Sequence, residues 1–161
     1  MAQIDVIRNT YGGLSYLRRA LNYVSDERAL NGWGYGVNPY SVNMAYRQML
    51  ATRRYFGKVS GNPLVHIVIA YDISVKDLAT AAMYGEYGAK YFANLYQVLC
   101  CTHEKDFEYG YFHTHIIINS VSYVNGYMIQ TGYEEMLAYC KYLEGIIGQK
   151  CSFTFDNKAN K

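Results

Sequence analysis

Three of the four histidines lie close together in the sequence, and their spacing suits a metal site. His113 and His115 are one residue apart in the strand-like stretch 111–121, so alternation would place both imidazoles on one face. His103 directly follows the apolar stretch 98–102, and pairing of the two stretches would bring it to the same site. Three neutral imidazoles leave open positions on a divalent ion that must also hold a substrate. The alternative is a set of partly buried, hydrogen-bonded histidines without a metal.

His66 is the fourth histidine, and two roles are open to it. It lies in the middle of the β-branched stretch 64–71. It is either a rival third ligand or a histidine of the core.

A tyrosine near the start of the chain is the candidate nucleophile. Leucines and a valine recur at helical spacing over residues 14–24. At about 100° per residue, Tyr23 lies well away from this apolar stripe, on the side of Arg19 and Tyr16. A tyrosyl oxygen can attack phosphorus. The chain has 19 tyrosines, so a surface tyrosine without a role is the alternative.

The positive charges are concentrated in the first part of the chain. The net charge is only +2, but residues 1–60 hold eight lysines and arginines against three acids, including every arginine. Guanidinium groups match phosphate oxygens, so this bias indicates nucleic acid, with an ordinary solvated face as the alternative. Tyrosines interleave with some of these cations, as in single-strand binding surfaces. The candidate DNA-binding residues are Arg18, Arg19, Arg47, Arg53, Arg54, Lys58, Trp33 and Tyr35, the last two in a glycine-rich stretch predicted to be irregular.

The chain length and its patterning predict one α+β domain. With 161 residues and 51% hydrophobic composition it can bury a sizeable core, and no apolar run approaches the ~20 residues of a membrane helix. We expect a central antiparallel sheet of about five strands with helices packed on its faces. The predicted strands are 3–9, 64–71, 98–102, 111–121 and 151–155, and the predicted helices are 14–24, 41–56, 75–95 and 133–147. Residues 1–155 would form the domain, and 156–161 a polar tail or linker.

Three blocks, taken in order, resemble the relaxase (mobilisation nuclease) domain of the HUH endonuclease superfamily, most like the MOBP type. The first block is Ala20 to Glu27, which contains Tyr23. The second is Val65 to Tyr71. The third joins His103 to the sequence HTHIIINSV at residues 113–121 and to the turn signal Asn125-Gly126.

The resemblance implies metal-dependent nicking of origin-of-transfer DNA and rejoining of the strand. Tyr23 would be the catalytic residue that forms a 5′-phosphotyrosine, and His103, His113 and His115 would hold one Mn²⁺ or Mg²⁺. His66, Asp72 and Asn119 would support the site, Asp72 by orienting a ligand histidine. The implied partners are single-stranded and hairpin origin DNA, an accessory relaxosome DNA-binding protein and a type IV secretion coupling protein, in a bacterial cytoplasm without membrane insertion.

The sequence departs from the family pattern at two points. More residues than usual separate His103 from His113, so a carboxylate of Glu104, Asp106 or Glu108 could replace His103 as ligand. The Ser-Phe of the second block is here Ala70-Tyr71, and the lost hydroxyl would have to come from Tyr71.

Other functions and another nucleophile remain open. Tyr16 is a fallback nucleophile. A rolling-circle initiator or transposase would use Tyr133 or Tyr139, after the histidine pair. A non-catalytic single-stranded-DNA-binding domain is the alternative from another class.

Overall fold

The computed structural model describes residues 1–8, 13–26, 29–105 and 109–156, and these form one six-stranded sheet with four helices. The sheet order is β2-β4-β5-β3-β1-β6. The strands are β1 (Ala2–Ile7), β2 (Ala29–Tyr35), β3 (Leu64–Ala70), β4 (Val98–His103), β5 (His113–Asn119) and β6 (Cys151–Asp156). The helices are α1 (Gly13–Val24), α2 (Val42–Tyr55), α3 (Leu78–Ala93) and α4 (Tyr133–Ile147).

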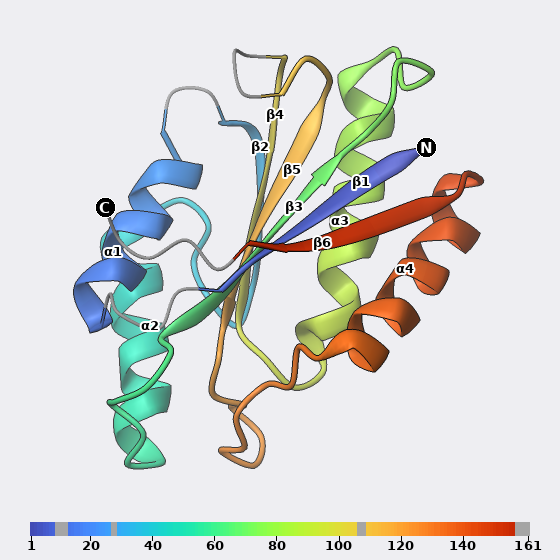
Figure 1. Cartoon of the computed structure of the whole chain (residues 1–161). Helices are drawn as coiled ribbons and strands as arrows, with labels where there is room; N and C mark the ends of the chain where they lie inside the picture. Colours follow the sequence, from blue (N-terminus) through green and yellow to red (C-terminus); the bar gives the residue numbers. More distant parts are fainter. Residues whose placement is uncertain (9–12, 27–28, 106–108, 157–161) are drawn as a thin grey trace.

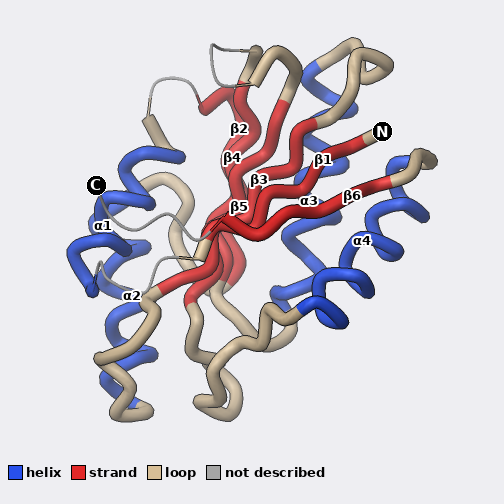
Figure 2. Tube along the Cα trace, in the orientation of Figure 1, coloured by secondary structure: helices blue, strands red, loops and turns tan. Residues whose placement is uncertain are grey.

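The helices cover both faces of the sheet, which gives three layers. In Figure 1, α1 and α2 lie on one side of the strands and α3 and α4 on the other, and Figure 2 shows the same division. Two apolar cores correspond to the two sides. The neighbouring residues Cys100 and Cys101 point into different cores, as strand alternation requires. The predicted α+β class with helices on the faces of the sheet is confirmed.

The sheet differs from the prediction in one strand and in one pairing. The glycine-rich stretch 31–38 is predicted to be irregular, but residues 29–35 form β2 and pair with β4. One of these glycines is needed for the turn that follows, because a Cβ on Gly34 would lie 2.3 Å from the carbonyl oxygen of Val37. The β1–β6 pair is parallel, whereas the other strand pairs are antiparallel.

Capping side chains explain where two of the helices begin. Ser41 caps α2, and its hydroxyl accepts from the Met44 amide at 3.2 Å. The third helix was predicted to begin after Ser74, but it begins at Leu78. Asp77 is its cap and accepts from the Thr80 amide at 2.8 Å. Among the described residues, no helix is both long and apolar enough to cross a bilayer.

A buried arginine joins α2 to the end of β5. The Arg53 side chain is fully buried, and its Nη1 donates to Ser120 Oγ at 2.7 Å and to Asn119 Oδ1 at 3.3 Å. It also donates to the carbonyl oxygens of Pro63 and Ser60 at 3.3 and 3.2 Å. The prediction that Arg53 contacts DNA is therefore wrong, because the guanidinium is enclosed by protein acceptors.

Asn119 belongs to the same buried network and not to the histidine site. It ends β5, whereas His113 begins it. Its Nδ2 donates to the Met49 carbonyl at 3.1 Å and to Gln97 Oε1 at 3.0 Å. This placement corrects the prediction that Asn119 supports the metal ligands.

Arg53 and its neighbour Arg54 provide a matched test of this network. Arg53→Ala leaves several buried acceptors without a donor. We therefore expect the free energy of unfolding in urea to fall by about 3 kcal/mol. Arg54 is exposed, and Arg54→Ala should change it by no more than about 0.5 kcal/mol. Equal effects of the two substitutions would contradict this assignment.

Candidate active site

The register of β4 and β5 assembles a cluster of three histidines. His103 lies directly opposite His113, and Cys101 lies opposite His115. All three imidazoles are buried, and one ligand atom from each lies within 4.8 Å of the others. The cluster is on the side of the sheet that α1 and α2 cover, because Cys101 packs in their core. The predicted ligand set is thus brought together at one place.

Hydrogen bonds to backbone carbonyl groups set the tautomers of two of these rings. Nε2 of His103 lies 2.8 Å from the Val24 carbonyl oxygen, and Nδ1 of His113 lies 3.0 Å from that of Tyr111. A carbonyl oxygen only accepts, so these nitrogens carry the proton. In a neutral ring the opposite nitrogen then holds the lone pair that a metal requires. The donor set therefore fits a divalent ion.

His66, on the neighbouring strand β3, contacts the third candidate ligand, His115. Its Nε2 lies 2.9 Å from Nδ1 of His115. Burial, with the nearby His103 as a smaller cause, lowers the pKa of His66 to about 4, so the ring is neutral near pH 7. A neutral His66 can accept a hydrogen bond from Nδ1 of His115. The lone pair on Nε2 of His115 is then available to a metal. This geometry favours His66 as an orienting residue over a rival ligand.

Tyr23 shares a cavity with the histidines. The cavity has a volume of about 270 Å³, and its walls include Tyr23, Arg19, His66 and His115. The ring centroids of Tyr23 and His115 are 5.5 Å apart, in an edge-to-face arrangement. Tyr23 is 39% exposed, so its ring borders both the cavity and solvent. This position agrees with the helical wheel, which places Tyr23 on the exposed side of α1.

Tyr16 and Tyr109 complete the aromatic part of the cavity wall. Burial raises the pKa of Tyr16, which disfavours its ionised form as a nucleophile. Tyr109 has its ring centroid 4.8 Å from that of His113, and its hydroxyl donates to Asp5 Oδ2 at 3.3 Å. Sequence reasoning missed Tyr109 because it lies in a loop without periodicity. Its closeness to the histidine pair was the one available signal.

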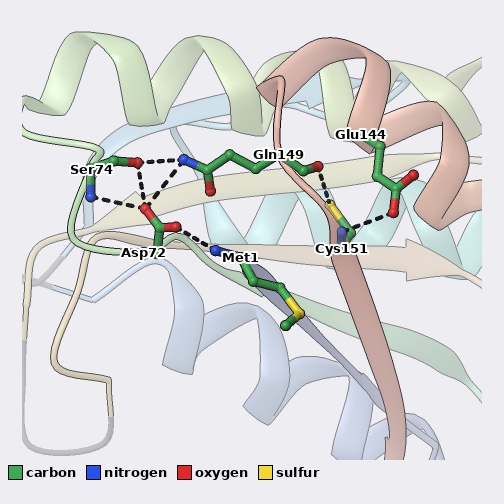
Figure 3. Close-up of polar contacts among 6 residues, drawn as sticks. All are labelled: Met1, Asp72, Ser74, Glu144, Gln149 and Cys151. Carbon is green, nitrogen blue, oxygen red and sulfur yellow. Dashed lines mark hydrogen bonds and ion pairs between the residues drawn. The ribbon is translucent and has the colours of Figure 1, made fainter.

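Asp72 belongs to a polar cluster of its own and not to the histidine cluster. Its carboxylate accepts from the Met1 α-ammonium group, from Ser74 and from Gln149 (Figure 3). These donors, the ammonium group first, hold the pKa of the Asp72 carboxyl well below its usual range. Within the described residues, no imidazole is among its hydrogen-bond partners. The prediction that Asp72 orients a ligand histidine is corrected accordingly.

Trp33 and Tyr35, predicted to contact DNA, lie on the face of the sheet away from the histidines. Trp33 pairs with Cys100, whose side chain packs in the core of α3 and α4, opposite the histidines. The Tyr35 hydroxyl donates to Glu86 of α3 at 3.3 Å.

Tyr71 is buried, and its hydroxyl lies 2.7 Å from Thr114 Oγ1, on the same face of the sheet as Trp33 and Tyr35. Tyr71 therefore cannot replace the hydroxyl that the second block lacks.

The remaining predicted cations are distributed over α1, α2 and the loop that follows α2. Arg18 lies over the ring of Tyr46 at 5.2 Å and donates to Asn43. Lys58 donates to the Gly126 carbonyl. Arg47 and Arg54 are exposed. Of the predicted DNA-binding cations, Arg19 is the one that lines the Tyr23 cavity.

The alternative ligands of the loop after β4 are only partly described. Glu104 is exposed, whereas the three clustered imidazoles are buried. Asp106 and Glu108 lie outside the described residues. The described part of the chain thus favours the three histidines as the ligand set.

Comparison with known proteins places the chain in a family. Residues 16–146 match the family model described as "Relaxase: MobA/VirD2-like, nuclease domain". The match includes Tyr23 and all four histidines and covers most of the chain, so the chain belongs to this family of relaxase nuclease domains. No curated protein matches the chain.

The His66–His115 pair predicts a specific effect on metal affinity. His66→Phe keeps an aromatic ring and removes the acceptor for His115 Nδ1. We expect Mn²⁺ binding, measured by isothermal titration calorimetry, to weaken by about 10- to 100-fold. Tyr16→Phe, which alters the same cavity wall, should leave the affinity unchanged. Unaltered Mn²⁺ affinity in His66→Phe would show that His66 does not orient a ligand.

Proposed function

We propose that this domain is a conjugative or mobilisation relaxase, of the MOBP type, that nicks one strand of origin-of-transfer DNA and rejoins it. The observation that carries the proposal is the shared cavity of Tyr23, Arg19 and His115 beside the three-histidine cluster. A nucleophile, a phosphate-binding cation and a metal-binding set are the parts that phosphodiester transesterification needs. Membership of the relaxase family supports the same reaction class.

Tyr23 performs the covalent step. Its hydroxyl oxygen attacks the phosphorus, the bond from phosphorus to the 3′ oxygen breaks, and the phenolic proton is lost as the 3′ oxygen gains one. The strand is left with a 3′ hydroxyl and a 5′ phosphate joined to Tyr23. Attack of a 3′ hydroxyl on this phosphotyrosine reverses the reaction. Because one phosphodiester replaces the other, rejoining needs no ATP.

The groups around Tyr23 bind and orient the phosphate. His103, His113 and His115 would hold one divalent ion, Mn²⁺ or Mg²⁺, which would polarise the phosphate and offset its negative charge. Arg19 lies one helical turn before Tyr23, and its guanidinium matches two phosphate oxygens. His66 keeps its neighbour His115 in the ligand tautomer.

The basic helices α1 and α2 suit the rest of the DNA. Their exposed arginines would follow the backbone on the layer that borders the cavity. We propose single-stranded and hairpin origin DNA as the substrate. An accessory relaxosome protein, a type IV coupling protein and a bacterial cytoplasmic location follow from the family resemblance and belong to this proposal.

The position of the other candidate tyrosines argues against a replication initiator or transposase. Tyr139 is fully buried on α4 and donates to the Gly88 carbonyl at 2.9 Å. Tyr133, also on α4, belongs to the layer on the far side of the sheet from the histidines. Neither is placed to attack a phosphate held at the three-histidine cluster.

The covalent intermediate is the direct test of this function. Incubated with single strands that carry the cognate origin and with Mn²⁺, the protein should form an adduct that survives a denaturing gel. Tyr23→Phe should abolish the adduct, because the ring without its oxygen is no nucleophile, and Tyr16→Phe should retain it. An adduct in Tyr23→Phe would reassign the nucleophile, and none in the wild type would contradict nicking.

Substitution of Arg19 and of Arg18 distinguishes an effect on catalysis from an effect on DNA affinity. Arg19→Ala removes the cation from the Tyr23 cavity, and we expect the nicking rate to fall by about 100-fold. Arg18→Ala, one residue away and outside that cavity, should lower DNA affinity but keep the rate at saturating DNA. Single-turnover kinetics measures both, and equal rate losses would mean that Arg19 has no particular role at the phosphate.

A further inference from the structure

A second hollow of about 350 Å³ lies beside the histidine cluster. Its walls include Gln3 of β1, Ala70 of β3, Asp72, and Tyr109 and Tyr111 of the loop before β5. Tyr111 is 41% exposed. The attack proposed for Tyr23 gives this hollow no role.

The hollow adjoins the place where the phosphate would be held. Ala70 pairs directly with the ligand His113 across β3 and β5. Tyr109 forms part of the walls of both the Tyr23 cavity and this hollow. The loop is also tied to the site, since the Tyr111 carbonyl oxygen accepts from Nδ1 of His113 at 3.0 Å. A strand bound at the histidines and leaving past Tyr109 therefore enters this hollow.

The side chains of the hollow suit a base and not a phosphate. Its walls, as the described residues give them, offer aromatic rings, an amide and the ion pair between the Met1 α-ammonium group and Asp72, and they contain neither lysine nor arginine. Aromatic faces bind bases by stacking, whereas the cation of this wall, the Met1 α-ammonium group, is already paired with the Asp72 carboxylate and is not left over for a phosphate. The volume is of the size that binds a small ligand.

The polar wall is fixed in advance by neighbouring side chains. Ser152 Oγ donates to Gln3 Oε1 at 2.6 Å, and Gln3 Nε2 donates to Asp5 Oδ1 and Thr154 Oγ1, each at 3.3 Å. Asp5 Oδ2 also accepts from the Tyr109 hydroxyl. One connected set of hydrogen bonds thus holds both the amide and the ring, and the second lone pair of Gln3 Oε1 can still accept from the edge of a base.

From these observations we infer that the hollow between Gln3, Tyr109 and Tyr111 binds the base of the nucleotide next to the scissile phosphate. The inference rests on the proposed function for the presence of a DNA strand at the histidines. Tyr109 separates the phosphate from this base, and the tyrosines supply stacking, so this subsite contributes to which origin sequence is cut.

Photocrosslinking locates the base without knowledge of the origin. The wild-type protein with Mn²⁺ is irradiated in the presence of a single-stranded oligonucleotide of 5-iododeoxyuridine. The crosslinked peptide is then identified by mass spectrometry. We expect the crosslink within residues 109–111. Crosslinks confined to other tyrosines, such as the exposed Tyr127, or no crosslink at all, would overturn the subsite.

Substitutions test the energetic role of the rings. Tyr111→Ala should weaken binding of the same oligonucleotide, followed by fluorescence anisotropy, by about 5- to 150-fold. Tyr109→Phe keeps the ring and should retain the crosslink, whereas Tyr127→Ala, outside the hollow, should bind as the wild type does. Wild-type affinity in Tyr111→Ala would contradict the proposal.

The outcomes separate this subsite from the nuclease activity. A Tyr23 adduct without a crosslink at residues 109–111 refutes the subsite alone. A crosslink at these residues without any Tyr23 adduct refutes the nuclease and leaves the base site standing.

Discussion

The antiparallel register of β4 and β5 is the constraint on which the site depends. It sets His103 opposite His113 and keeps His115 on the same face of the sheet. A slip of one residue would turn the imidazoles of one strand toward α3 and α4 and separate the ligands. Both strands are buried on both faces and contribute side chains to the two cores, so the packing of the sheet and the geometry of the histidine cluster are specified together. Backbone carbonyl groups of Val24 and Tyr111 then select the tautomers.

The helix α1 connects this cluster to the candidate chemistry. Its apolar stripe packs on the sheet through Leu17 and Leu21, which points Tyr23 and Arg19 into the cavity at the histidines. The Val24 carbonyl oxygen of the same helix accepts a hydrogen bond from Nε2 of His103. Movement of α1 would therefore disturb the candidate nucleophile and one candidate ligand at once. Such coupling suits a reaction in which the attacking oxygen and the phosphate must be held in one geometry.

Local periodicity explains which parts of the account could be predicted from sequence. The shared face of the histidine pair follows from strand alternation, and the exposure of Tyr23 from the helical wheel. Tertiary packing decided the rest. Arg53 and Arg54 are adjacent and of one type, yet only the first is enclosed, because its helix face meets the end of β5. Asp72 follows the predicted strand of His66 in the sequence, but its partners include side chains from distant segments, among them Gln149. Burial and long-range partners of this kind leave no local pattern.

Anomalous diffraction from crystals grown with Mn²⁺ tests the central claim most directly. The account predicts one manganese peak within coordination distance of His103, His113 and His115, in the cavity that Tyr23 borders. It also predicts coordination through Nδ1 of His103 and through Nε2 of His113 and His115. A peak held by Glu104 in place of His103, or no manganese at the cluster, would contradict it.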